Sequence, residues 1–258
     1  MLVDSHCHLD YFTEAEIEGI VGRAREAGVG LLVTIGVRVG QAAAVKALAE
    51  RFPDVWGTVG VHPHNAGEPE GLPTVEEIVA LADHPRIIGI GESGLDYFYD
   101  KSPHDAQQEG FRRHIRAARL AGLPLAIHAR QADEDIIRIL REERASGGEF
   151  DFLLHCFSSG PELARQAVAM GGYVSFSGIL TFPKSPEIRA VASELPAERL
   201  LVETDSPYLA PVPLRGKRCE PAYVAHTARV LAEARGLSGA EVEALTTANF
   251  RRLFRKVA

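Results

Sequence analysis

Two histidines near the amino terminus are the first side chains in this sequence that suit metal chemistry. They lie in the stretch Asp4-Ser5-His6-Cys7-His8-Leu9-Asp10, which follows the apolar pair Leu2-Val3. Side chains alternate between the faces of a strand, so His6 and His8 should point to one side at the end of a first strand. Two imidazoles a few ångströms apart can bind one metal ion from neighbouring directions. A His-x-His pair is also compatible with two polar side chains at a strand end, so its interpretation depends on the rest of the chain.

Four further acidic or imidazole side chains follow later apolar runs, each where a predicted strand ends. They are Glu92 after 86–91, His128 after 123–127, His155 after 150–154 and Asp205 after 200–202. With His6 and His8 they exceed the needs of one tetrahedral zinc site and suit two metal ions about 3.5–4 Å apart, bridged by Glu92. Such a pair lowers the pKa of a bridging water and polarises a phosphoryl or carbonyl oxygen. Asp205 is placed both to bind a metal and to accept the proton of the attacking water.

These side chains converge only if the elements that carry them form a barrel. After the first strand, strands are predicted at 29–37, 55–61, 86–91, 123–127, 150–154, 173–176 and 200–202. Helices are predicted at 14–27, 40–51, 74–83, 104–121, 132–145, 161–170, 186–194, 222–235 and 239–256. Strict alternation with short connections favours parallel strands and right-handed crossovers. Eight such units in about 250 residues predict an α/β protein with the (β/α)8 TIM-barrel fold, a single domain over 1–258, with the metal site at the C-terminal mouth. An open doubly wound sheet is the alternative, but no Gly-x-Gly-x-x-Gly follows the first strand.

Composition indicates an ordinary globular protein, with 46% hydrophobic and 24% charged residues. The net charge of −7 gives no broad positive field for wrapping a duplex. Cys7, Cys156 and Cys219 suggest neither a disulfide framework nor a Cys-x-x-Cys zinc site, which favours a reducing compartment. No signal peptide and no membrane-spanning apolar run are found. We therefore expect a cytoplasmic protein without a membrane anchor, and nothing indicates an obligate protein partner.

Five residues are candidates for substrate binding. His62 and His64 form a second His-x-His, placed to contact a phosphate or supply a proton, with a loop-shaping role as the alternative. Arg130 lies two residues after a predicted ligand and can bind a phosphate oxygen bidentately. Lys217 and Arg218 belong to the one dense basic loop, for which a solvated charge run and phosphate binding are both open.

Two carboxylates are candidates for supporting the ligands. Glu203 shares a strand face with Asp205, and Asp96 lies four residues after Glu92. Each is placed to orient a histidine ligand through its second ring nitrogen.

With these motifs assembled, the chain resembles the TatD family of metal-dependent deoxyribonucleases, within the amidohydrolase-type barrels, over essentially its whole length. The motifs that carry the resemblance are residues 4–10, 59–64, 91–96, 128–130, 155–160 and 203–209, with 215–218 and the region of Asn249. The resemblance implies the barrel, a divalent metal site on His6, His8, Glu92, His128, His155 and Asp205, and hydrolysis of DNA from the 3′ end.

The leading hypothesis is a metal-dependent 3′–5′ exodeoxyribonuclease that acts on single-stranded DNA or frayed ends. Two divalent ions are expected, with zinc, manganese or magnesium as candidates. A second hypothesis is a hydrolase of a carbonyl substrate, such as an amide, a lactone or an aminoacyl ester on tRNA. A third is a metal-binding protein with little turnover, which a complete ligand set with a spare base disfavours.

Overall fold

Eight parallel strands form the barrel and pair in chain order from β1 to β8. The computed structural model describes residues 1–257. The strands are β1 (Leu2–Cys7), β2 (Val29–Ile35), β3 (Val55–Val59), β4 (Ile87–Asp96), β5 (Leu125–Arg130), β6 (Phe152–Leu154), β7 (Tyr173–Phe176) and β8 (Leu200–Val202). A parallel bridge between Cys7 and Ser206 joins the end of β1 to the segment after β8. The predicted (β/α)8 barrel is therefore confirmed as a nearly closed barrel.

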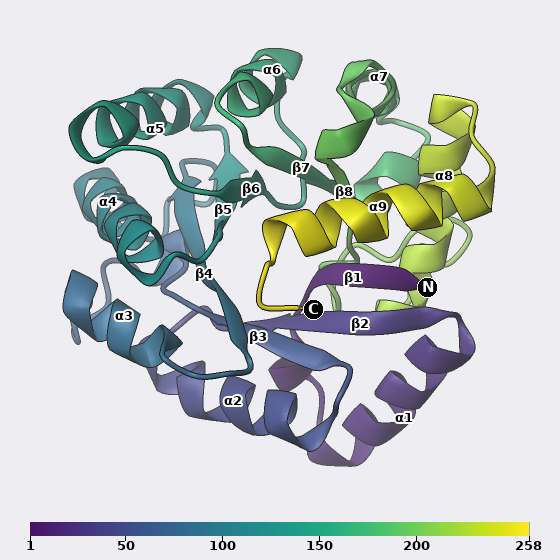
Figure 1. Cartoon of the computed structure of the whole chain (residues 1–258), viewed down its shortest axis with the longest axis horizontal. Coiled ribbons are helices and arrows are strands. Elements are labelled where there is room, and N and C mark those ends of the chain that lie inside the picture. Colours follow the sequence, from purple (N-terminus) through teal and green to yellow (C-terminus); the bar gives the residue numbers. More distant parts are fainter. Residues whose placement is uncertain (258) are drawn as a thin grey trace.

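Helices alternate with the strands and surround them (Figure 1). They are α1 (Glu14–Glu26), α2 (Ala42–Arg51), α3 (Val75–Ala82), α4 (His104–Ala121), α5 (Asp133–Gly147), α6 (Pro161–Ala169), α7 (Pro186–Glu194), α8 (Val224–Arg235) and α9 (Gly239–Leu253). Helix α1 begins with a reciprocal capping box between Thr13 and Glu16, which satisfies backbone N–H groups of its first turn. The same device begins α3 at Thr74 and α9 at Ser238.

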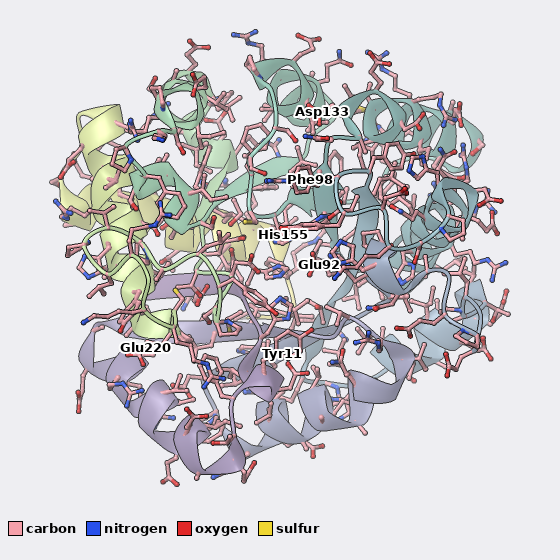
Figure 2. The ribbon with its side chains drawn as sticks, turned by 180° about the vertical axis from the view of Figure 1, so that it is seen from behind. Tyr11, Glu92, Phe98, Asp133, His155 and Glu220 are labelled. Atoms are coloured by element: carbon pink, nitrogen blue, oxygen red, sulfur yellow. The ribbon has the colours of Figure 1, made fainter. Side chains whose placement is uncertain are left out.

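Helix α9 closes the end of the barrel opposite the mouth. It crosses the front of the barrel in Figure 1, and Phe250, Leu253 and Phe254 pack with residues inside the barrel such as Ile88 and Leu201. Figure 2 shows the reverse side, where Glu92 and His155 lie near the centre of the molecule. With one end filled by apolar side chains, the polar groups at the strand ends are accessible only from the mouth.

The clearest differences from the sequence prediction concern where strands end. Strand β4 continues through Glu92 to Asp96, and β5 continues through His128 to Arg130, whereas the prediction ended these strands at 91 and 127. The prediction stopped each strand where polar residues begin. In the structure these polar residues continue the ladder between β4 and β5, with Gly94 opposite His128 and Asp96 opposite Arg130.

Candidate metal centre

The six side chains predicted as metal ligands meet at the mouth, around the carboxylate of Glu92. His6 lies on β1, His128 on β5, and His8, His155 and Asp205 follow β1, β6 and β8. The imidazole nitrogens near Glu92 are Nε2 of His155 (2.7 Å), Nδ1 of His128 (3.1 Å), Nε2 of His6 (3.3 Å), Nε2 of His62 (3.3 Å) and Nε2 of His8 (3.9 Å). One carboxylate thus faces five imidazoles contributed by four strands and the segments that follow them.

Asp205 provides a second carboxylate, which lies beside His6 and His8. Its Oδ1 lies 3.5 Å from His8 Nε2 and 3.8 Å from His6 Nε2. The ring of His6 stacks on that of His155 at 3.8 Å between centroids and 8° between planes. The side chains from β1, β6 and β8 therefore form one compact group.

The unpaired nitrogen atoms of this group test whether a metal ion fits it. His6 Nδ1, His6 Nε2 and His8 Nδ1 are buried without a hydrogen-bond partner in the described structure. Each unsatisfied buried polar group costs about 1–3 kcal/mol. Imidazole nitrogens and carboxylate oxygens are the donors that zinc and manganese prefer, so a divalent cation fits these residues.

The donor atoms fall into three overlapping groups whose members lie within 4.8 Å of one another. The groups are His6 with His8 and Asp205, His62 with Glu92 and His128, and His6 with His155 and Glu203. From the sequence, His62 was predicted to contact the substrate and Glu203 to orient a histidine ligand. The structure places both within reach of the proposed ligands, so either is also available to a metal.

Electrostatics keep both central carboxylates ionised. Burial opposes ionisation of Glu92, but the imidazoles of His155 and His62 hold its pKa well below the ordinary value. Burial also opposes ionisation of Asp205, and its contact with His8 outweighs that effect and lowers its pKa. Burial lowers the pKa of His62 to about 4. Ionised carboxylates and a neutral imidazole are the protonation states that bind a cation.

Asp96 holds two imidazoles at the mouth. Its buried Oδ2 lies 2.8 Å from His64 Nε2 and 3.0 Å from His128 Nε2, and its Oδ1 accepts the backbone N–H groups of Phe98 and Tyr99. An ionised carboxylate only accepts hydrogen bonds. A cation bound at Nδ1 would leave the proton of His128 on Nε2, where Asp96 accepts it.

Glu203 holds His155 in the same manner. Its Oε1 lies 3.3 Å from His155 Nδ1 and accepts the backbone N–H of Cys156 at 2.7 Å. A cation bound at Nε2, which lies 2.7 Å from Glu92, would leave the proton of His155 on Nδ1, where it faces Glu203. The predicted partners of the histidine ligands are thus in contact with them.

The predicted substrate-binding residues separate into two groups. His62, His64 and Arg130 line the cavity of about 910 Å³ that contains the metal centre. Lys217 and Arg218 are exposed and do not belong to its described lining. Arg218 instead donates to Glu16 Oε1 at 2.9 Å and to the carbonyl of Tyr11 at 2.6 Å, so its predicted DNA contact stays a prediction.

Several residues that line this cavity were not predicted from the sequence, among them Tyr11, Tyr99, Lys101 and Tyr208. Tyr11 directly follows the motif 4–10 and Tyr208 lies within the motif 203–209, and these positions were the available signal. Tyr99 and Lys101 follow β4 in an irregular segment, whose position depends on packing that the sequence pattern does not reveal.

Comparison with known proteins gives consistent matches over the full length. A model of the family described as TatD related DNase matches residues 3–255. An uncharacterized metal-dependent hydrolase from Bacillus subtilis is 38% identical over 260 residues, which cover 99% of each chain. A protein from Escherichia fergusonii named a 3′-5′ ssDNA/RNA exonuclease is 35% identical over 244 residues, which cover 92% of each chain.

A solved structure shows the same architecture. The crystal structure of a TatD homolog from Escherichia coli K12 superposes with a TM-score of 0.89 at 26% identity and covers 98% of each chain. Separately, no helix among residues 1–257 is long and apolar enough to cross a membrane.

Proposed function

Since the chain belongs to the TatD family of metal-dependent hydrolases, we propose that it is a 3′–5′ exonuclease that hydrolyses the phosphodiester bonds of single-stranded DNA. The observation that carries this proposal is the meeting of five imidazoles, two carboxylates and Arg130 in one accessible cavity. Hydrolysis of a phosphodiester needs an acidified water and a cation for the phosphate oxygens, and this cavity offers residues for both. The name of the Escherichia fergusonii relative supports the 3′–5′ polarity.

We propose that two divalent ions would be held by His6, His8, Glu92, His128, His155 and Asp205. Zinc, manganese and magnesium are the candidates, of which the imidazole-rich donor set favours the first two. Ions at this place would supply Lewis acidity, acidifying water and neutralising charge on a phosphoryl oxygen. Orphaned imidazole nitrogens at the centre support this assignment.

The side chains of the protein divide the remaining work. Asp205 accepts the proton of the attacking water, because its ionised carboxylate lies at the mouth and its side chain is 15% exposed. Arg130 binds a phosphate oxygen of the strand, and His62 and His64 contact the phosphate from the segment that follows β3. Asp96 and Glu203 fix the ring orientation of His128 and His155.

Lys217 and Arg218 are not assigned a contact inside the cavity in this proposal. They lie outside the cavity lining, on the exposed segment that follows β8. The guanidinium of Arg218 donates to the Tyr11 carbonyl, which places it beside the edge of the cavity. We propose that these two cations attract the phosphates of the strand toward the mouth.

Product analysis of an end-labelled single-stranded oligonucleotide tests the proposal. The purified protein is incubated with Mg²⁺ or Mn²⁺, beside the variants His155→Ala and His226→Ala. His226 on α8 is a matched control because it is a partly buried imidazole that does not line the cavity. Stepwise shortening from the 3′ end by the wild type and His226→Ala, but not by His155→Ala, is the expected result.

The opposite result would redirect the proposal. If no metal supported cleavage, while carboxylic esters or amides were hydrolysed with the same dependence on His155, the substrate would be a carbonyl compound. Metal binding without turnover of either class would leave only the binding protein.

A further inference from the structure

Aromatic side chains are unusually exposed at the mouth of the barrel. Phe98, Tyr99 and Tyr208 are 48%, 58% and 53% exposed, and the first two follow β4 while the third follows β8. Among residues 1–257, only Met1, Val39 and Leu120 are comparably exposed large apolar side chains. A ring that keeps half of its surface in water at the edge of an active site is available to stack on a ligand.

The aromatic side chains form two groups on opposite sides of the metal centre. Tyr11 stacks on His8 at 4.9 Å between centroids, and Tyr208 lies 6.3 Å from Tyr11. The rings of Phe98 and Tyr99 lie 4.8 Å apart. In Figure 2, Phe98 and Tyr11 lie on opposite sides of the pair formed by Glu92 and His155. A phosphate held at the centre would therefore have an aromatic group on each side.

Two cations without an ion-pair partner among the described residues lie beside Phe98 and Tyr99. The guanidinium of Arg130 lies 4.9 Å from the centroid of Phe98, and Lys101 Nζ lies 5.8 Å from the centroid of Tyr99. Neither forms an ion pair with a described acidic residue, in contrast to Arg218 on the Tyr11 side, which pairs with Glu16. The Phe98 side thus combines stacking surface with free positive charge.

We infer that the two groups are stacking subsites for the nucleosides on either side of the cleaved bond. The 3′-terminal nucleoside stacks on the side of Tyr11 and Tyr208, and the penultimate nucleoside stacks on Phe98 and Tyr99. The terminal nucleoside ends in a hydroxyl group, whereas the penultimate one carries a further phosphate, which Lys101 and Arg130 neutralise. The inference rests on the proposed function.

This arrangement also gives a physical reason for a preference for unpaired ends. Base–aromatic stacking tolerates any base but needs an accessible face of the ring, which a base inside a duplex does not offer. A 3′ end would have to separate from its complement before its last two bases reached the two aromatic groups. The subsites therefore specify single-stranded nucleic acid as the substrate class.

Deleting a base from the substrate and a ring from the protein tests the inference. The protein variants are Phe98→Ala with Tyr99→Ala, Tyr208→Ala and the control Leu120→Ala, an exposed apolar residue of α4. The substrates are oligonucleotides with an abasic unit at the penultimate or the terminal position. Alanine at 98 and 99 keeps the support of Asp96, because that contact uses backbone N–H groups.

Removal of the base and removal of the ring should have overlapping effects on the rate only where both abolish the same stacking contact. An abasic penultimate unit should lower kcat/KM of the wild type and Leu120→Ala by about 5- to 150-fold, the range expected for one stacked base. The Phe98/Tyr99 variant lacks the stacking rings, so its kcat/KM should already be reduced on the intact oligonucleotide. Its kcat/KM on the abasic oligonucleotide should be nearly the same. The Tyr208 variant should be insensitive to an abasic unit only when that unit is at the terminal position. Equal sensitivity of the wild type and the matching variant to base removal would overturn the inference.

A binding experiment separates this inference from the proposed function. With protein stripped of metal, the fluorescence of 2-aminopurine at the penultimate position reports stacking without turnover. Quenching by the wild type and Leu120→Ala but not by the Phe98/Tyr99 variant supports the subsite even if no cleavage is found. Cleavage by the wild type with unchanged quenching in that variant would refute the subsite and leave the exonuclease intact.

Discussion

Replacing Asp205 with asparagine should separate proton transfer from metal binding. The change keeps the shape of the side chain and removes its charge and basicity. Asp205 has a φ of 60°, and its N–H donates to the carbonyl of His6 at 2.9 Å. Asparagine tolerates this left-handed conformation better than most residues, so the backbone should stay in place. The variant therefore tests chemistry with little disturbance of the fold.

The geometry sets the size of two separate effects. Oδ1 of Asp205 lies 3.5 Å from His8 Nε2 and 3.8 Å from His6 Nε2, so it would be among the groups that hold a cation. Loss of one charge of an interacting pair costs on the order of 4 kcal/mol at 4 Å and an effective dielectric constant of 20, which is roughly 10³-fold in metal affinity. Loss of a general base lowers kcat by about 10²- to 10⁴-fold. The first effect is overcome by added metal, whereas the second persists at saturation.

The assay is the initial rate of oligonucleotide shortening across a Mn²⁺ titration, with bound metal measured by mass spectrometry. We expect Asp205→Asn to keep most of its metal at saturation and to stay at least about 10²-fold slower. Asp83→Asn, an exposed carboxylate at the end of α3, is the matched control and should behave as the wild type. Turnover within a few fold of the wild type at saturating metal would show that Asp205 is not the base.

Three further perturbations follow from the same contacts. Glu203→Gln weakens the support of His155, so metal affinity should fall by about 10- to 100-fold in a chelator competition; unchanged affinity would mean that Glu203 does not orient this ligand. Lys217→Ala combined with Arg218→Ala should raise KM for oligonucleotides, reduce the salt slope by about 0.7 per lost phosphate contact and spare small phosphodiesters. Equal losses on both substrates would place these cations in the chemistry or the fold. Burial lowers the pKa of His114 to about 4. Between pH 6.5 and 4 its imidazole therefore binds a proton in the unfolded state but not in the folded state. The free energy of unfolding should therefore fall by up to roughly 3 kcal/mol more across this range in the wild type than in His114→Gln, and parallel urea-derived stability curves would contradict this role.

The barrel and the centre of the site were predictable because both depend on local patterns. Strand and helix periodicity alternate along the chain, and only a few topologies satisfy eight parallel units. Parallel strands bring their carboxyl ends to one side, so His6, Glu92 and His155 meet although 149 positions separate the first from the last (155 − 6). The types and positions of these residues were therefore sufficient to predict that they meet at the mouth of the barrel.

The rim of the mouth was less predictable because it depends on contacts between distant segments. Arg218 carries the charge expected of a phosphate contact, but in the fold it pairs with Glu16, 202 positions away. His62 was predicted to contact substrate, and only the packing of β3 against β4 brings it to 3.3 Å from Glu92. Side-chain partners of this kind arise when the barrel closes, and no local pattern specifies them.

Backbone strain supports the functional importance of the mouth independently of its side chains. Among residues 1–257, the non-glycine residues with positive φ are Asp100, Gln131, Cys156, Asp205 and Leu209, and all of them follow the carboxyl ends of strands β4, β5, β6 or β8. Such a conformation costs about 1–3 kcal/mol at each position, which the surrounding contacts must offset. At the opposite end of the barrel, Gly28 and Gly122 adopt positive φ without that cost, where α1 and α4 turn into the next strands. At these two positions glycine is sufficient, because only a reversal of the chain is needed. At the mouth, Asp205 adopts a positive φ and also carries a functional side chain, which glycine cannot supply. Such a combination is expected where the side chain takes part in the chemistry.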